Sequence, residues 1–299
     1  MKLFAYGTLL AGMRLHEMLA GAHFLGPAII RGKLLDLGDY AGLVEGDAIV
    51  TGEIYEIDHT LLERLDQVEG FRPYDPAGSL YRRKDVGARR FADGTTVDVA
   101  AYFFSRATER EHQITCGDFR RYETEKNGAE VRVIAYGSNL STERLAKRLK
   151  RFGPERAAQR AATVLPGCIE GFRLTFNKKR HEGGPPYANI EFVGEGTQCP
   201  AVVWSLTPEE IVVIDEKEGA TGRNGSTQYH RIGMPFLAAD GPMVAHAYVA
   251  NPDWIQEPAL PSPEYLDHLR TGYREQGLNP HHLEDALVRA SSPLVGGSG

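Results

Sequence analysis

Two glutamates of this 299-residue chain stand in the same local pattern, Asp-x-x-Glu-Gly. Glu69 belongs to Asp66-Gln67-Val68-Glu69-Gly70, and Glu218 belongs to Asp215-Glu216-Lys217-Glu218-Gly219. Each glutamate lies four positions past an apolar residue of a helix-like segment, which turns its carboxylate toward the buried side. Because burial raises the pKa of a carboxyl group, either glutamate can serve as a general base near neutral pH.

The alternative interpretation is a surface glutamate at the end of a helix that stops at the glycine. A carboxylate near a helix C-terminus interacts unfavourably with the helix dipole, so the position favours a role beyond stability. Asp66 and Asp215 are expected to make local hydrogen bonds rather than to catalyse.

A second repeated motif can supply hydrogen-bond donors. Tyr6-Gly7-Thr8-Leu9 and Tyr136-Gly137-Ser138-Asn139-Leu140 each follow an apolar, strand-like run. A strand that ends at glycine can turn sharply and aim consecutive backbone N–H groups into one concavity, which suits a carboxylate or a developing oxyanion. An ordinary strand-to-loop turn is the alternative. Its occurrence twice at matched positions weighs against that alternative.

Two downstream tyrosines are further candidates. Tyr81 lies 12 residues after Glu69, and Tyr229 lies 11 residues after Glu218. Either tyrosine can donate to a substrate or belong to a strand core, and the sequence leaves both interpretations open. The histidines show no metal-ligand spacing with carboxylates or cysteines, so no metal site is predicted.

The two sets of residues indicate two copies of one domain. Tyr6 and Tyr136 are 130 positions apart, whereas Glu69 and Glu218 are 149 apart. The second copy therefore carries 19 extra residues between its motifs, where loops absorb insertions easily.

The domain boundary is predicted near residue 128, because the polar segment 123–128 is typical of a linker. The predicted domains are residues 1–128 and 129–290. Residues 291–299 are rich in Gly and Ser and are predicted to form a flexible tail.

The elements of each copy follow the same predicted order: an apolar strand, a helix-like segment, short strands, a helix, and late strands. Asp58 and Thr207 are expected to cap the helices that lead to the two glutamates. The expected buried residues of those helices are Leu61, Leu62 and Leu65, and Ile211, Val212 and Ile214. Short strands with few helices and no regular βαβ alternation predict an α+β fold with a small barrel-like sheet.

Composition excludes several classes of protein. The net charge of -6 and the pI of about 6.0 give no electrostatic footprint for nucleic acid. No apolar stretch approaches the roughly 20 residues that a membrane span needs, and no signal peptide precedes the first motif. The three scattered cysteines fit neither a disulfide framework nor a Cys-x-x-Cys metal site, so a cytoplasmic location is expected. The sequence leaves the oligomeric state open.

The chain resembles the γ-glutamylcyclotransferase superfamily twice over. The second half, over residues 131–286, is similar to γ-glutamylcyclotransferase itself through Ala135–Leu140, Asp215–Gly219, Tyr229 and Pro261–Tyr265. The first half, over residues 1–122, is similar to the γ-glutamylamine cyclotransferase branch through Tyr6–Leu9, Val50–Tyr55, Leu65–Glu69 and Tyr81–Arg83. The resemblance implies two tandem α+β domains, each a small mixed β-barrel with flanking helices.

The resemblance also implies a reaction, in which a γ-glutamyl amide or dipeptide gives 5-oxoproline and a free amine without a cofactor or a metal. The substrate's own α-amine attacks its γ-carbonyl, and closure of a five-membered ring has a high effective molarity. Glu69 and Glu218 are implied to be the bases and then the acids for the leaving amine. The implied substrate-binding residues are Tyr6, Gly7, Thr8, Leu9 and Tyr81, and Tyr136, Gly137, Ser138, Asn139, Leu140, Tyr229 and Tyr265.

The first half departs from this pattern in one place, because no counterpart of Tyr265 follows its last strand at Ile114–Phe119. Three hypotheses therefore stand: two working sites, one working site beside a packing or binding domain, and a protein that binds γ-glutamyl ligands without turnover. The presence of both glutamates favours two working sites and argues against binding without turnover. The sequence does not identify the leaving amine, which can be an amino acid, another amine or a natural-product intermediate.

Overall fold

The computed structural model of the chain describes residues 1–75, 77–106, 111–128, 130–180, 182–221 and 227–292. The chain forms two compact units. The first is Met1–Gly128 together with Ile232–Met234, and the second contains the remaining described residues. Each unit holds a closed, mixed β-barrel with flanking helices, so the predicted α+β fold with two tandem barrels is confirmed.

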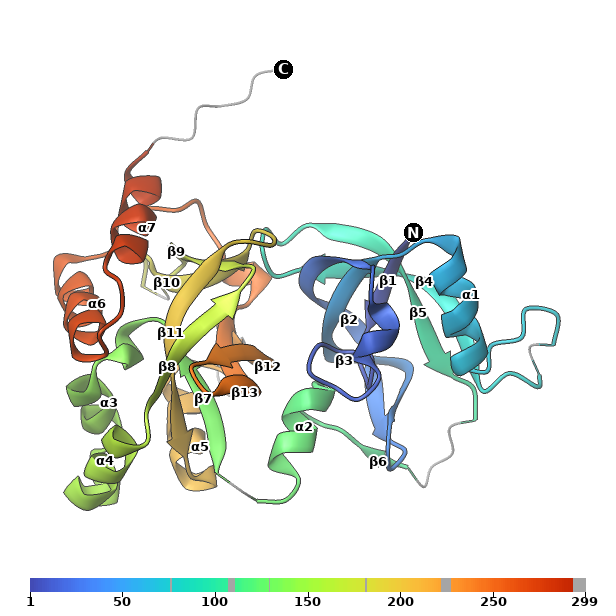
Figure 1. Ribbon diagram of the computed structural model, residues 1–299, viewed down its shortest axis with the longest axis horizontal. Coiled ribbons are helices and arrows are strands. Elements are labelled where there is room, and N and C mark those ends of the chain that lie inside the picture. The colour runs from blue at the N-terminus through green and yellow to red at the C-terminus, as the bar shows by residue number, and fades with distance from the viewer. Residues whose placement is uncertain (76, 107–110, 129, 181, 222–226, 293–299) are drawn as a thin grey trace. The chain divides into compact units, whose positions relative to one another are not determined.

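The first barrel is drawn in blue to cyan in Figure 1. Its strands are β1 (Lys2–Ala5), β2 (His23–Asp36), β3 (Ala41–Glu56), β4 (Tyr81–Arg90), β5 (Thr96–Phe104) and β6 (His112–Gln113). The sheet order is β3-β1-β5-β4-β2-β6, and the barrel closes because β2 also pairs with β3. The pair β1–β5 is parallel, which brings the first strand beside the last long one.

The helices of the first unit are η1 (His16–Leu19), a 3₁₀ helix, α1 (His59–Val68) and α2 (Phe119–Glu125). Asp58 caps α1 as predicted, since its Oδ1 accepts a hydrogen bond from the N–H of Leu61 over 2.7 Å. The predicted linker at 123–128 is partly wrong, because α2 runs into it. That helix is anchored by Arg120, whose buried guanidinium donates to Glu53 over 2.6 Å.

The second barrel consists of β7 (Val131–Ala135), β8 (Leu165–Glu170), β11 (Gln198–Leu206), β12 (Tyr229–Ala238) and β13 (Gly241–Ala250). Its order is β11-β7-β13-β12-β8, and β7 runs parallel to β13. The strands β9 (Phe172–Lys178) and β10 (Tyr187–Phe192) form a separate two-stranded sheet. The parallel pairing of the first strand with the last repeats the arrangement of the first barrel.

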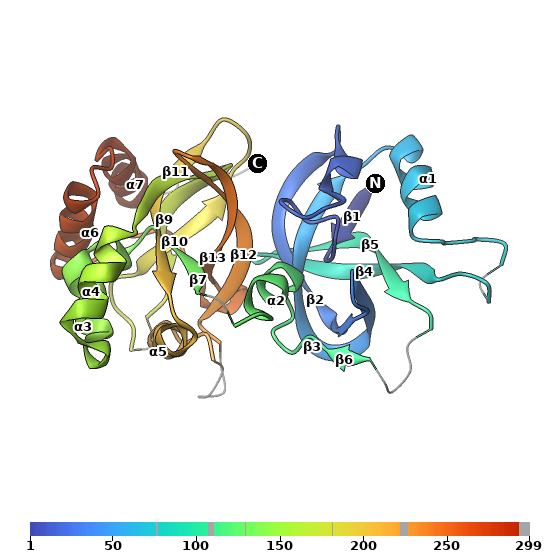
Figure 2. The same ribbon diagram turned by 60° about the horizontal axis from the view of Figure 1, so that its bottom comes forward.

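The second unit carries additional helices. They are η2 (Ser138–Leu140), α3 (Thr142–Arg148), η3 (Lys150–Phe152), α4 (Gly153–Ala162), α5 (Pro208–Lys217), η4 (Pro252–Trp254), α6 (Pro263–Glu275) and α7 (His281–Ser291). Four of these helices, α3, α4, α6 and α7, gather on one side of the second barrel in Figure 2. Between their first two barrel strands the first unit has 17 residues (6–22) and the second has 29 (136–164), so the helices and turns that replace η1 hold 12 of the 19 extra residues predicted for the second copy.

One predicted core residue is wrong, because Val212 is 47% exposed while Val213 is buried. Thr207 begins α5 with a capping box that includes Glu210. Glu210 is fully buried and pairs with Arg160, which turns the 210–213–214 face of the helix inward and leaves Val212 in solvent.

The predicted flexible tail is also partly corrected, since Ser291 is the last residue of α7. Residues 293–299 lie outside the described part of the chain. Of the helices that the structure describes, none combines the length and the apolar character needed to cross a membrane.

Candidate active site

Both candidate glutamates occupy the same place at the end of a helix. Glu69 follows the last residue of α1, and Glu218 follows the last residue of α5. The next residues, Gly70 and Gly219, have φ angles of 59° and 64°, a left-handed conformation that glycine adopts without strain. In both copies the residue after the glycine donates its N–H to the carbonyl of the motif's aspartate over 2.8 Å. This closure fixes the direction of the chain immediately after each glutamate.

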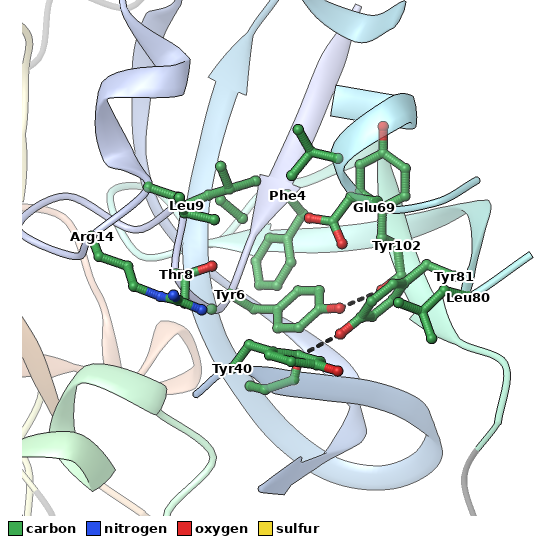
Figure 3. A pocket seen from close by; sticks show the side chains of 15 residues that line it. Phe4, Tyr6, Thr8, Leu9, Arg14, Tyr40, Glu69, Leu80, Tyr81 and Tyr102 are labelled. Atoms are coloured by element: carbon green, nitrogen blue, oxygen red, sulfur yellow. Dashed lines mark hydrogen bonds between the residues drawn. The ribbon is translucent and has the colours of Figure 1, made fainter. Parts of the chain in front are cut away.

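The first glutamate opens into a cavity of about 240 Å³. All the residues that the sequence assigned to the first site line it: Tyr6, Gly7, Thr8, Leu9, Glu69 and Tyr81. The lining residues that were not foreseen include Arg14, Tyr40, Leu80 and Tyr102. Figure 3 shows Glu69 and Tyr81 at one end of this cavity and Arg14 at the other.

Two tyrosines of the first cavity are fixed by hydrogen bonds to the backbone, drawn as dashed lines in Figure 3. Tyr6 donates its hydroxyl to the carbonyl of Tyr102 over 2.6 Å, and Tyr81 donates to the carbonyl of Ala41 over 3.0 Å. Both rings are buried. Tyr81 is therefore at once a core residue and a lining residue, and its hydroxyl oxygen is left to accept rather than donate.

The carboxylate of Glu69 is partly buried, and burial raises the pKa of this group to about 7. Within the described part of the chain, no residue donates a hydrogen bond to it. A carboxyl group with this pKa is about half ionised at neutral pH, so it can both take up and release a proton there.

The second glutamate borders a much smaller cavity of about 40 Å³. The predicted residues that line it are Tyr136, Gly137, Ser138, Asn139, Glu218, Tyr229 and Tyr265. The assignment of Leu140 to this site is not supported, because its side chain is fully buried in the core and its N–H donates to the carbonyl of Gly137 over 3.0 Å. A leucine is buried here because η2 packs its apolar side inward.

The tyrosines of the second cavity repeat the bonds of the first. Tyr136 donates its hydroxyl to the carbonyl of Tyr248, and Tyr229 donates to the carbonyl of Ala188 over 2.8 Å. Tyr229, like Tyr81, is therefore both a buried core residue and a residue that lines the cavity, the two interpretations that the sequence left open.

Tyr265 accounts for much of the difference in size. Its hydroxyl accepts a hydrogen bond from the N–H of Ala188 over 3.3 Å, and its ring lies 5.0 Å from that of Tyr187. A Cβ on Gly137 would lie 3.4 Å from this hydroxyl, whereas a Cβ on Gly7 would meet only Ala41, at 3.8 Å. The aromatic ring that fills the second cavity has no equivalent among the residues that line the first.

Glu218 differs from Glu69 in its hydrogen bonds. Its Oε1 accepts from Asn139 Nδ2 over 3.0 Å and from Arg148 Nη1, which lies on α3. The side chains of Arg148 and Glu218 are 18% and 16% exposed. The second carboxylate is thus engaged by a cation, whereas the first faces an open cavity.

A hydrogen-bond network holds the aspartate that lies three residues before each glutamate. Tyr102 donates its hydroxyl to Asp66 Oδ1 over 2.7 Å, and Arg83 donates to the same carboxylate over 2.5 Å. In the second unit, the Tyr248 hydroxyl and Arg231 Nε donate in the same way to Asp215 Oδ1, each over 2.7 Å. Because Tyr6 and Tyr136 bond to the backbone of Tyr102 and Tyr248, each network links the Tyr-Gly turn to the helix that carries the glutamate.

The residues that were not foreseen had weak signals in the sequence. Tyr40-Ala41 and Tyr187-Ala188 are matching pairs, and Arg14 and Arg144 each lie eight positions after the motif tyrosine. Arg148 had no such signal, because its contact with Glu218 joins residues 70 positions apart. Among the described residues, no group of three or more His, Cys, Asp or Glu side chains is arranged to hold a metal ion.

Comparison with known proteins supplies a family. A family model described as gamma-glutamyl cyclotransferase, AIG2-like, matches residues 3–121 and again 133–267. A curated relative, the gamma-L-glutamyl-butirosin B gamma-glutamyl cyclotransferase of Niallia circulans, is 39% identical over 71 residues, which are 23% of this chain and 46% of that protein. The gamma-glutamylcyclotransferase family protein YtfP of Escherichia coli K12 is 37% identical over 67 residues, 22% of this chain and 59% of that protein. The chain thus spans about half of the length of these curated relatives.

A solved structure matches along almost the whole chain. The crystal structure of YkqA from Bacillus subtilis aligns with a TM-score of 0.73, and the alignment covers 95% of each chain. The sequences are 19% identical, so this likeness concerns the fold, including its tandem arrangement.

Proposed function

The chain belongs to the gamma-glutamyl cyclotransferase, AIG2-like, family, and on this premise we propose that its first site converts γ-glutamyl amides into 5-oxoproline and a free amine. The observation that carries the proposal is Glu69. It is a carboxyl group with a pKa of about 7 that opens, without a hydrogen-bond donor among the described residues, into a cavity of about 240 Å³.

The proposed reaction needs one group that moves a proton twice. Ionised Glu69 takes a proton from the substrate's α-ammonium, and the freed amine attacks the γ-carbonyl carbon to form the new C–N bond of the ring. The protonated carboxyl then gives that proton to the leaving nitrogen as the old C–N bond breaks. The ring nitrogen still carries two hydrogens after the attack, so it gives its second proton to the regenerated carboxylate, which passes it to the released amine; the amine leaves as an ammonium ion and Glu69 is ionised again. Atoms and charges balance without water, and a pKa near 7 suits both transfers at neutral pH.

The oxyanion that forms during the attack needs hydrogen-bond donors. The Tyr6-Gly7-Thr8-Leu9 turn lines the same cavity as Glu69. Among the described residues, no hydrogen-bond acceptor engages the N–H of Thr8 or Leu9. The N–H of Leu10, by contrast, donates to the carbonyl of Gly7 over 3.1 Å. We assign the oxyanion and the glutamyl carboxylate to these two donors.

The substituent on the leaving nitrogen is assigned to the end of the cavity where Arg14 lies, away from Glu69 and Tyr81 (Figure 3), while the nitrogen itself stays within reach of Glu69. This end is open because no ring occupies the place that Tyr265 has in the second site. The first site can therefore admit a bulkier leaving group than the second.

The experiment is to measure 5-oxoproline release from a panel of γ-glutamyl amino acids and γ-glutamyl amines. Wild type, Glu69→Gln, Glu218→Gln and the double variant are compared. We expect Glu69→Gln to lower turnover of its part of the panel at least about 100-fold, as loss of a general base commonly does.

The outcomes separate the hypotheses. If each single variant loses a different part of the panel, both halves are enzymes. If Glu69→Gln silences every substrate, only the first site turns over. Full activity of Glu69→Gln on all substrates, or no release by wild type from any of them, would contradict the proposal.

For the second half, a second candidate function is the binding of a γ-glutamyl ligand without turnover. The observation in its favour is that Glu218 is already paired with Arg148. Retained ligand binding with no loss of turnover in Glu218→Gln would support it.

A further inference from the structure

The second cavity is too small for a γ-glutamyl ligand in the state described here. Its volume of about 40 Å³ suffices for a water molecule, whereas the cavity beside Glu69, to which the same ligand class is assigned, measures about 240 Å³. Glu218 is covered at the same time by Arg148 and Asn139. Side chains must therefore move before a ligand reaches this carboxylate.

The contact that closes the site is the ion pair between Arg148 and Glu218. Both side chains are largely buried, with 18% and 16% of their surface exposed. Breaking such a pair without replacement leaves a charge buried without a partner, which is strongly unfavourable. Arg148 is thus expected to leave Glu218 only when another anion takes its place.

Two buried polar atoms beside this pair lack partners. Among the described residues, nothing hydrogen-bonds Asn139 Oδ1, an acceptor, or Arg144 Nε, a donor. Arg144 interacts electrostatically with Arg148, Glu218 and Tyr265, so it belongs to the same cluster. An unused acceptor and an unused donor next to a carboxylate and a guanidinium fit a ligand that carries both an ammonium and a carboxylate group.

We propose that Arg148 holds the second site closed by pairing with Glu218, and that the carboxylate of an α-amino-acid head group opens it by taking over the guanidinium. The ammonium of the ligand then meets Glu218 and Asn139 Oδ1. The exchange replaces one ion pair by two and makes or breaks no covalent bond. The inference rests on the proposed function in one respect, because a γ-glutamyl group is such a head group.

The first copy lacks this device. Arg148 lies 12 positions after Tyr136, and the residue 12 positions after Tyr6 is Met18. Glu69 accordingly has no cation bonded to it among the described residues. Partner exchange by an arginine is therefore assigned to the second site alone.

The chain contains its own reporter for the test. Both of its tryptophans, Trp204 and Trp254, lie in the second half. Trp204 donates its Nε1–H to the carbonyl of Asn139 over 3.0 Å, directly beside the proposed site. Tryptophan fluorescence therefore follows binding in the second half without a contribution from tryptophans of the first.

The probes are L-norvaline, which carries an α-ammonium and an α-carboxylate, and its α-carboxamide, which keeps only the ammonium; each is titrated into the full chain. We expect wild type to prefer the carboxylate by about 10- to 100-fold, the range of a hydrogen bond between charged groups. Arg148→Met is expected to bring the two affinities within about 3-fold of each other. Arg148→Lys should keep part of the preference, and Lys147→Met, an exposed change on the same helix, should keep all of it.

Three results would overturn the inference. One is an equal loss of affinity for both probes in Arg148→Met, which indicates a merely structural role. Another is an equal gain for both, which indicates a plug that does not contact the ligand. The last is the absence of any carboxylate preference in wild type. If Arg148→Met fails to fold by circular dichroism, Arg148→Gln replaces it in the same comparison.

Failure of this inference is distinguishable from failure of the proposed function. Release of 5-oxoproline by wild type, and its loss in Glu69→Gln, are measured without reference to Arg148. Either result can hold while the other fails.

Discussion

At the scale of single residues, ionised Glu69 lowers the stability of the folded state and is also the form proposed to accept a proton in the site. It ends a helix, where the dipole disfavours a negative charge, and burial raises its pKa from 4.5 to about 7. The ionised form that can accept a proton is therefore the form that the folded protein tolerates less well. Two measurements follow from this conflict.

The first concerns stability. Since the folded-state pKa lies above the unfolded one, stability is highest where Glu69 is protonated in both states, and it falls as the pH rises from about 4.5 to 7. Glu69→Gln removes this fall, so we expect the free energy of unfolding to be unchanged near pH 4 and raised by about 1–3 kcal/mol at pH 8. Urea denaturation at both pH values measures it. Glu63→Gln, exposed on the same helix, is the control, and an equal effect at both pH values would contradict the assignment.

The second concerns the rate. Only ionised Glu69 can accept a proton, so kcat/KM of the first site is expected to rise about tenfold per pH unit below pH 7 and to level off above it. The Glu218→Gln variant isolates this site. A profile that is flat between pH 5 and 8 would exclude Glu69 as the titrating base.

At the scale of elements, the helix–glycine junction positions the base. Gly70 has a φ of 59°, and a Cβ there would lie 3.3 Å from Cβ of Leu80, a residue that lines the first cavity. The junction thus holds the end of α1 against the wall of the cavity.

Gly70→Ala is expected to cost about 1–2 kcal/mol in unfolding free energy, through backbone strain, and to lower first-site kcat/KM as well. Gly21→Ala is the matched control, since Gly21 has a φ of 88° and an added Cβ there would meet no atom within 4 Å. It should lose stability and keep activity. Thermal unfolding and 5-oxoproline release together decide, and equal activity losses in the two variants would show that the position of Gly70 carries no special role.

The elements show what local sequence can and cannot predict. The cap at Asp58 and the strand–glycine motifs depend on neighbours in sequence, so they were predicted from it. The exposure of Val212 was not, because the phase of α5 is set by Glu210 and its partner Arg160, 50 residues away. The contact between Arg148 and Glu218 was not predicted for the same reason, since these two residues meet only in the folded unit.

At the scale of the whole molecule, the chain repeats one support in both units. A tyrosine hydroxyl and an arginine hold the aspartate three residues before each glutamate, and the backbone of the same tyrosine holds the motif tyrosine. The two halves therefore share this hydrogen-bond network as well as the two glutamates.

Tyr102→Phe and Tyr248→Phe test this support in turn. Each removes one hydrogen bond to a paired carboxylate, so we expect each to lower the free energy of unfolding by about 1–2 kcal/mol. Tyr102→Phe should also reduce first-site turnover, whereas Tyr248→Phe should leave it intact. Substrate assays in parallel with denaturation check both points, and a loss of first-site turnover in Tyr248→Phe would mean that the units do not act separately.

The parallel pairing of first and last strands has a consequence for how the chain folds. β1 pairs with β5 at Leu3 and Ala100, and its look-alike β7 pairs with β13 at Val133 and His246. During synthesis every strand of the first barrel has been made before β7 begins at Val131, so β1 finds its own partner with no competitor present. Refolding from denaturant offers both look-alike strands at once. Exchange of β1 and β7 between the barrels is then the misfolding route to expect, and the order of translation is what guards against it.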